Sequence, residues 1–261
     1  LMIAPRALNP HALGPLPGPL TYLPETDSTN TQARLGALAG APWGSVWVAE
    51  AQTAGRGRDG RQWQTFPYDS LAFSILLPAL PPTLPLVASL SVVRAVKAVT
   101  GRGLQIKWPN DLRRQGLKVG GILTEGFRQP QPGLVVGIGL NINPPATTPE
   151  GLEFHYTTLG TGLPQPLPRE EVLAAIINQL WADSQVLVQQ GFGAFYDDYV
   201  AACDSLGQTV TWRTATHQVS GLAAGLDASG ALSLRQPDGT VVLCRAGDII
   251  QPGPDGEGAP R

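Results

Sequence analysis

The segment 52–63 constrains the fold of this 261-residue chain more than any other stretch, because it carries a glycine pattern tied to one particular fold. Gly55, Gly57 and Gly60 match G-x-G-x-x-G, which binds dinucleotides when a strand precedes it and a helix opens directly after it. The preceding residues read as a strand, but residues 62–67 are short, bulky and end in proline, so they predict no helix. The sequence therefore argues against a Rossmann dinucleotide site.

Three arginines alternate with these glycines and suggest a different use for the loop. Arg56, Arg58 and Arg61 supply planar, permanently charged forks that bind phosphate or carboxylate through paired hydrogen bonds. Glycines let a backbone bend sharply and approach a ligand closely. The pattern indicates a site for a small, multiply charged anion, with an ordinary solvated surface loop as the alternative.

Composition limits the classes of partner. The net charge is -2, from 18 basic and 20 acidic residues, so no overall field attracts nucleic acid or an anionic membrane. No apolar run approaches the roughly 20 residues of a membrane span. Cys203 and Cys244 have neither C-x-x-C nor metal-ligand spacing, which favours reduced thiols in a cytoplasmic protein. We therefore expect a cytoplasmic protein that binds neither nucleic acid nor membranes.

The order of elements predicts an α+β fold. Apolar runs and their flanking turn residues indicate strands at 45–50, 70–77, 104–108, 117–125 and 134–143, and helices at 31–39, 84–100, 169–190 and 195–203. Regular βαβ alternation is missing, which favours a mixed or antiparallel sheet with flanking helices. From about Gly207 the pattern changes to short strands at 209–212, 218–226, 231–234 and 240–244, typical of a small SH3-like barrel.

Four polar clusters, in this order and spacing, resemble the catalytic core of biotin protein ligases. They are residues 27–30 (D-S-T-N), the arginine loop 52–63, K-W-P-N-D at 107–111 with K-V-G-G-I-L at 118–123, and G-I-G-L-N-I-N at 137–143. Each motif alone is weak, whereas the combined set is highly specific, and the resemblance runs from roughly Thr21 to Gln251.

The resemblance implies a domain organisation and a reaction. It predicts a catalytic domain 21–205 of the class II synthetase/biotin ligase type and an SH3-like domain 206–251. Outside it, the proline-rich residues 1–20 predict an irregular lead-in, and the Gly/Pro-rich residues 252–261 predict a disordered tail. Members of the family activate biotin with ATP to biotinyl-5′-AMP. They then transfer the biotinyl group to a lysine of biotin carboxyl carrier protein, a subunit of acetyl-CoA carboxylase. ATP, with Mg²⁺ carried on its phosphates, and biotin would be the ligands.

The resemblance also assigns residues to these ligands. Those implied at biotin are Ser28, Thr29, Asn30, Gln52, Gly55, Arg56, Gly57, Arg58, Lys118, Gly121 and Gly137. Those implied at ATP are Arg56, Arg58, Arg61, Trp63, Asn110, Lys118, Asn141 and Tyr156. Lys118, Arg56 and Asp111 are implied in catalysis, with Lys118 contacting the biotin carboxylate and α-phosphate and Asp111 orienting the acceptor amine.

Some of these residues have ordinary structural explanations. Ser28 and Thr29 could cap the helix expected after them, Trp63 could pack in the core, and Asn110-Asp111 could be a turn after an extended Trp-Pro segment. For Lys107, phosphate contact and a structural salt bridge remain equal alternatives.

Three further questions concern the whole protein. About 20 proline-rich residues precede the core, fewer than a helix-turn-helix domain needs, so we expect a monofunctional ligase without the DNA-binding domain of some relatives. A lipoate or octanoyl ligase on the same architecture and a non-catalytic biotin or nucleotide sensor are the competing functions. Homodimer formation is left open.

Overall fold

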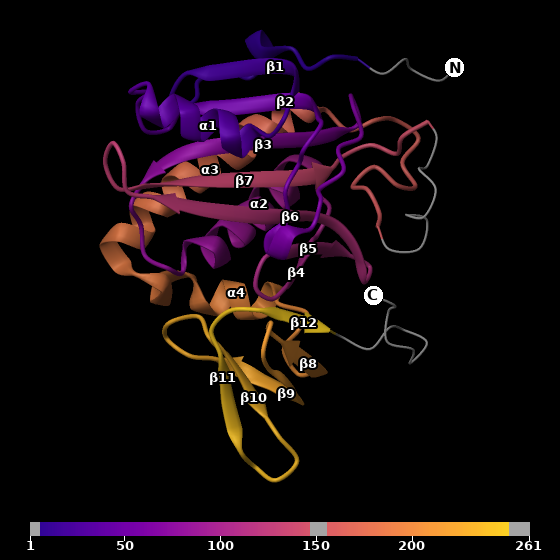
Figure 1. Cartoon of the computed structure of the whole chain (residues 1–261). Coiled ribbons are helices and arrows are strands. Elements are labelled where there is room, and N and C mark those ends of the chain that lie inside the picture. The colour runs from indigo at the N-terminus through magenta and orange to yellow at the C-terminus, as the bar shows by residue number, and fades with distance from the viewer. Residues whose placement is uncertain (1–5, 147–155, 251–261) are drawn as a thin grey trace.

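The computed structural model describes residues 6–146 and 156–250, so the expected tail at 252–261 lies outside the described residues. A seven-stranded mixed sheet, ordered β1-β2-β3-β7-β6-β5-β4, forms the larger part (Figure 1). The edge pair β1 and β2 is parallel and every other neighbouring pair is antiparallel. Its strands are β1 (Leu20–Thr26), β2 (Val46–Gln52), β3 (Ser70–Pro78), β4 (Gln105–Lys107), β5 (Asp111–Arg114), β6 (Leu117–Phe127) and β7 (Gly133–Asn141).

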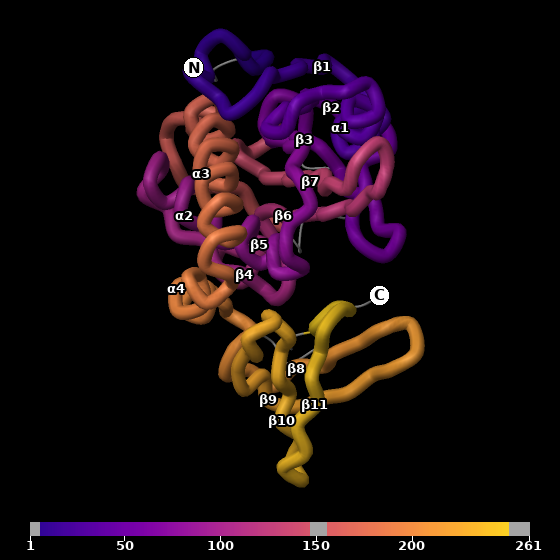
Figure 2. Tube along the Cα trace, turned by 90° about the vertical axis from the view of Figure 1, so that its left-hand side faces the viewer, coloured from indigo at the N-terminus to yellow at the C-terminus, as the bar shows by residue number. Residues whose placement is uncertain are grey.

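Helices cover both faces of this sheet, which explains its nearly continuous apolar central strands β3 and β7. On one face α1 (Thr29–Leu38) packs through Ala33 and Ala37 onto Trp47 of β2. On the opposite face α2 (Leu84–Thr100) and α3 (Arg169–Gln190) lie side by side over the main core (Figure 2). Gly101 ends α2 in the left-handed conformation, with φ 69°.

A second, antiparallel sheet, ordered β11-β10-β9-β8-β12, forms the SH3-like C-terminal part. Its strands are β8 (Thr209–Arg213), β9 (Gln218–Leu226), β10 (Leu232–Arg235), β11 (Val241–Cys244) and β12 (Asp248–Ile250). The 3₁₀ turn η3 (Phe192–Phe195) and α4 (Tyr196–Ala202) lead into it (Figure 2). It meets the larger sheet where the indole nitrogen of Trp108 donates to the carbonyl oxygen of Gly230 at 3.1 Å. The α+β prediction with a mixed sheet is therefore confirmed.

Local details differ from the sequence expectations. The large residues Leu35 and Leu38 of α1 are both exposed, because the small residues Ala33 and Ala37 make its contact with the sheet. Residues 108–110 form a turn with a cis Trp108–Pro109 bond instead of an extended segment. Strands β1, β5 and β12 were not expected, and β5 inserts between β4 and β6.

The segment before β1 packs closely despite its single regular element, the 3₁₀ turn η1 (Pro10–Ala12). Leu8 and Leu13 are buried in the main core beside α3. No helix in residues 6–146 or 156–250 combines the length and apolarity needed to cross a membrane.

Candidate functional site

The arginine loop, residues 52–63, folds back on itself above the sheet. The Trp63 amide donates to the carbonyl oxygen of Gly55 at 2.9 Å, and the Gly57 amide donates to that of Arg61 at 2.7 Å. A side chain at position 55 would overlap the Trp63 carbonyl, so this close approach requires glycine. The turn between the two arms is the 3₁₀ element η2 (Arg58–Gly60), and no α-helix follows it. The rejected dinucleotide motif is thus a hairpin-like loop.

A first cavity, of about 110 Å³, lies between this loop, the start of α1 and strands β6 and β7. Most of the predicted biotin residues line it. They are Ser28, Thr29, Asn30, Gln52, Arg56, Gly57, Arg58, Lys118, Gly121 and Gly137, joined by Arg61, Trp63, Asn110 and Asp111. Ser28 occupies the N-cap position of α1, but its side chain makes no capping bond, so the capping alternative does not account for it.

The floor of the first cavity is a buried hydrogen-bonded network. Gln52 Oε1 accepts from the Thr29 amide at 2.9 Å, and Ser74 Oγ donates to Asn30 Oδ1 at 2.6 Å. A Cβ atom at Gly137 would overlap the Asn30 side chain. The amide of Asn30 therefore reaches the cavity because position 137 carries no side chain.

A lysine–aspartate pair forms another wall. Lys118 Nζ donates to Asp111 Oδ1 at 2.6 Å, and Gly121 lies opposite Asp111 in the β5–β6 ladder. Burial alone would raise the pKa of Asp111, but Lys118 and then Lys107 outweigh it and hold the pKa below its usual range. Asp111 is therefore an anion at neutral pH, placed in the first cavity.

Lys107 faces Asp111 from β4 but lines neither cavity described here. Burial lowers the pKa of Lys107 to about 8, against the opposing attraction of Asp111. Lys107 therefore lies outside the described ligand space, with its charge beside that of Asp111.

The lowered pKa of Lys107 predicts a pH-dependent stability. The unfolded chain keeps this proton up to about pH 10.5, whereas the folded chain releases it near pH 8, so stability rises with pH between these values. Relative to Lys107→Met, the wild-type free energy of unfolding should gain up to about 3 kcal/mol across that window. Urea unfolding at several pH values measures this, with Lys97→Met, at an exposed lysine, as control. Parallel wild-type and Lys107→Met curves would contradict it.

A second cavity, of about 720 Å³, adjoins the first on the other side of Trp63. Gly55, Gln52, Trp63, Lys118, Asn141 and Tyr156 line it, together with Phe66 and Pro67. The Tyr156 and Phe66 rings lie 5.2 Å apart between centroids, giving an aromatic wall. Every residue predicted for biotin or ATP thus lines at least one of the two cavities.

Trp63 packs against the sheet and also borders both cavities. Its indole lies against Gly139, where a side chain would overlap the ring, and its buried Nε1 has no hydrogen-bond partner among the described residues. Gln52, Gln62, Trp63 and Lys118 border both cavities.

Two carboxylates that the sequence analysis missed neutralise the arginines. Arg56 forms a two-bonded pair with Glu125 of β6, at 2.9 and 3.2 Å. Arg58 and Arg61 both pair with Asp248 of β12. Arg58 also donates to Asn110 Oδ1 at 3.0 Å and to the carbonyl oxygen of Gly247 at 3.1 Å. Glu125 lies close behind the K-V-G-G-I-L motif, whereas nothing in the sequence connects Asp248 with the loop.

Comparison with known proteins agrees with this arrangement. Residues 22–143 match the Biotin/lipoate A/B protein ligase family, and residues 205–250 match the Biotin protein ligase C terminal domain. The biotin–acetyl-CoA-carboxylase ligase of Paracoccus denitrificans is 34% identical over 85% of this chain and 96% of that protein. The bifunctional ligase/repressor BirA of Bacillus subtilis is 31% identical over 84% of this chain and 70% of its own length.

Solved structures agree as well. The biotin protein ligase from Aquifex aeolicus in complex with biotin and ATP superposes with a TM-score of 0.79 at 31% identity, covering 88% of this chain and 97% of that one. Both matched family regions, the relatives and the superposition lead to the same conclusion: this chain belongs to the biotin protein ligase family.

Proposed function

We propose that this chain is a biotin protein ligase that activates biotin with ATP and transfers the biotinyl group to a lysine of biotin carboxyl carrier protein. The observation that carries the proposal is the position of Lys118, which borders both cavities beside a loop of three arginines. A carboxylate in one cavity and a polyphosphate in the other would meet at this ammonium. The names of the Paracoccus and Aquifex relatives support the same reaction.

In the first step a carboxylate oxygen of biotin attacks the α-phosphorus of ATP, and pyrophosphate leaves. Both reactants are anions, so cationic groups around the reacting atoms lower the barrier. We assign this work to Lys118, Arg56 and Arg58. Each now has a carboxylate or amide partner, and we expect the phosphates to replace Glu125 at Arg56 and Asp111 at Lys118.

In the second step the acceptor lysine gives up a proton to solvent, its neutral amine attacks the acyl carbon, and the bond to AMP breaks with AMP as the leaving group. We assign the orientation of the incoming lysine to Asp111. Its anionic state attracts an ammonium group, and Lys118 vacates it once phosphate is bound.

Binding roles divide between the cavities. We assign biotin to the first, whose polar floor of Ser28, Thr29, Asn30 and Gln52 suits the ureido ring. We assign the binding of adenine and ribose to Tyr156, Asn141 and Trp63 in the second cavity. Arg61 and Asn110 remain on the phosphate side. A lipoate ligase would need a long apolar tunnel, whereas the polar floor of the first cavity favours biotin.

Mg²⁺ would arrive on the ATP phosphates and offset part of their charge. Among residues 6–146 and 156–250, no group of three or more His, Cys, Asp or Glu side chains could hold a metal ion. Mg²⁺ keeps several waters and is usually bound through substrate phosphates.

Two further proposals concern organisation and location. We divide the chain near residues 205–206 into the ligand-binding domain and the SH3-like domain, supported by the separate sheets and the match at 205–250.

We place the protein in the cytoplasm. The buried thiols of Cys203 and Cys244, which form no disulfide, suit that reducing compartment.

Biotin-dependent exchange of radioactive pyrophosphate into ATP tests the proposed activity directly. The ligase must catalyse exchange with biotin and not without it. A sensor would bind the ligands without exchange, and lipoate binding much tighter than biotin binding would overturn the substrate assignment.

Arg58→Gly should release the adenylate prematurely. The substitution removes a charged fork from the phosphate but leaves Lys118 for chemistry, so biotinyl-AMP still forms and escapes faster. Because a charged hydrogen bond to the adenylate is lost, we expect escaped biotinyl-AMP to label a bystander protein such as albumin roughly ten- to a hundredfold more. The comparison is made at equal ATP consumption, with Arg128→Gly, an exposed arginine outside both cavities, as control. Wild-type labelling by Arg58→Gly would refute the clamp.

A further inference from the structure

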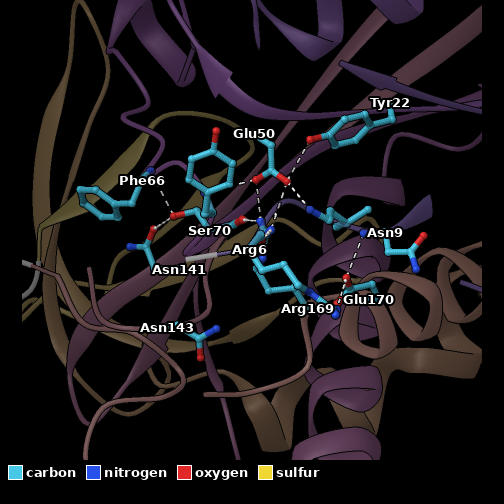
Figure 3. Close-up of polar contacts among 12 residues, drawn as sticks. Arg6, Asn9, Tyr22, Glu50, Phe66, Ser70, Asn141, Asn143, Arg169 and Glu170 are labelled. Carbon is cyan, nitrogen blue, oxygen red and sulfur yellow. Dashed lines mark hydrogen bonds and ion pairs between the residues drawn. The ribbon is translucent and has the colours of Figure 1, made fainter. Parts of the chain in front are cut away.

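A buried ion pair stands behind the second cavity without lining it. Glu50 of β2 is 2% exposed and Arg169, the first residue of α3, is 5% exposed. Arg169 donates two hydrogen bonds to the Glu50 carboxylate, at 2.8 and 3.1 Å (Figure 3). Burying two charges is favourable only when their remaining hydrogen-bonding capacity is filled. The other partners of this pair therefore indicate what it holds in place.

Those partners fix one turn of the chain. Glu50 Oε2 accepts from the Tyr68 amide at 3.2 Å, and Arg169 donates to the carbonyl oxygen of Ser70 at 2.9 Å. The backbone of Tyr68 is in the left-handed region, with φ 70°. This conformation costs energy for a residue with a bulky side chain. The ion pair thus stabilises residues 68–70 in a conformation that is unfavourable for the isolated segment.

The same turn positions two walls of the second cavity. Ser70 Oγ accepts from the Phe66 amide at 3.2 Å and lies 3.2 Å from Asn141 Oδ1, to which it donates (Figure 3). Phe66 and Asn141 line the second cavity, and Phe66 packs on Tyr156. One buried hydroxyl therefore connects the ion-paired turn to the residues that face the ligand.

The Tyr22 hydroxyl of β1 donates to Glu50 at 3.4 Å, and two further contacts tie this pair to the start of the chain. The Leu8 amide donates to Glu50 Oε1 at 2.6 Å, and Arg169 donates to the carbonyl oxygen of Arg6 at 2.8 Å. None of Glu50, Arg169 and Ser70 lines the first cavity. The floor of that cavity is formed by other residues of α1, β2 and β3.

We propose that Glu50, Arg169 and Ser70 are positioning residues for the nucleotide alone. They hold the turn 66–70, and through it Phe66 and Asn141, in the arrangement that accepts the adenosine part of ATP. The inference rests on the proposed function, because it takes the second cavity as the nucleotide site. It predicts a selective defect, in which ATP binding weakens while biotin binding does not.

Ser70→Ala is the decisive variant, since it cuts the link between the turn and Asn141 without leaving a buried charge unpaired. We expect the KM for ATP in biotin-dependent exchange to rise about five- to tenfold. The dissociation constant of biotin, measured by calorimetry without ATP, should stay within about twofold. Ser89→Ala is the matched control, because Ser89 is equally buried and donates to Pro85 within α2. Its KM for ATP should equal that of the wild type.

Glu50→Gln should produce the same selectivity with a larger rise in the KM for ATP, if circular dichroism shows a folded protein. Should this variant fail to fold, Ser70→Ala decides by itself. The inference is overturned if Ser70→Ala and Ser89→Ala have the same KM for ATP, or if Ser70→Ala weakens biotin and ATP binding equally. Absence of biotin-dependent exchange in the wild type would instead overturn the proposed function.

Discussion

Lys118→Ala should reduce biotin-dependent ATP–pyrophosphate exchange by about 10²- to 10³-fold, the loss typical when a charge aimed at a transition state is removed. The same substitution should lower the free energy of unfolding by less than about 1 kcal/mol, because partly exposed ion pairs contribute little to stability. The Lys118 side chain is 40% exposed, and its partner Asp111 keeps Lys107 as a neighbouring cation. Exchange kinetics and urea unfolding on the same preparation measure both quantities.

The chain provides a matched control for this experiment. Its only other lysine besides Lys107 is Lys97, which is exposed on α2 and donates to the carbonyl oxygen of Gly101. Lys97→Ala should exchange at the wild-type rate. Near-normal exchange by Lys118→Ala would remove this residue from the mechanism.

Gly137→Ala should weaken biotin binding by about a hundredfold, through a steric effect on one side chain. The added methyl group would overlap Asn30, which must then leave its hydrogen bond with Ser74 and move into the first cavity. Overpacking of this kind costs about 1–3 kcal/mol of stability, so the variant should still fold. Calorimetric titration with biotin measures the affinity.

Gly126→Ala is the control, since Gly126 lies in the adjoining strand β6 and an added Cβ would meet Leu134 at an ordinary 3.5 Å. Its biotin affinity should match that of the wild type. The assignment of biotin to the first cavity is wrong if Gly137→Ala binds biotin as tightly as Gly126→Ala does.

Long, strongly patterned elements could be predicted from the sequence, and short ones could not. The helix at 84–100 has exactly the predicted bounds, because an apolar run with proline in its first turn ends at a glycine. Strand β5, in contrast, has four residues, of which three are charged, and exists because β4 and β6 flank it. On α1 the large Leu35 and Leu38 are exposed, because small alanines allow the opposite face of the helix to approach Trp47.

The same distinction holds at the site. Residues within the four motifs could be found because their types and spacings occur together, and every residue assigned to biotin or ATP lines one of the two cavities. Glu125 and Asp248 could not be found, since a carboxylate in a strand says nothing about which arginine it will meet. The fold supplies each of the three arginines of the loop with an acidic partner.

The two cavities share the walls made by Gln52, Gln62, Trp63 and Lys118, and this has a consequence for the intermediate. Biotin and ATP would each occupy one compartment and dissociate independently of the other. Once the reaction joins them, the product is anchored in both compartments at the same time, and each half keeps the other at a high effective concentration. Release then requires both anchors to open together. The enzyme would hold its reactive intermediate far more tightly than either substrate, without a single contact beyond those that bind the substrates.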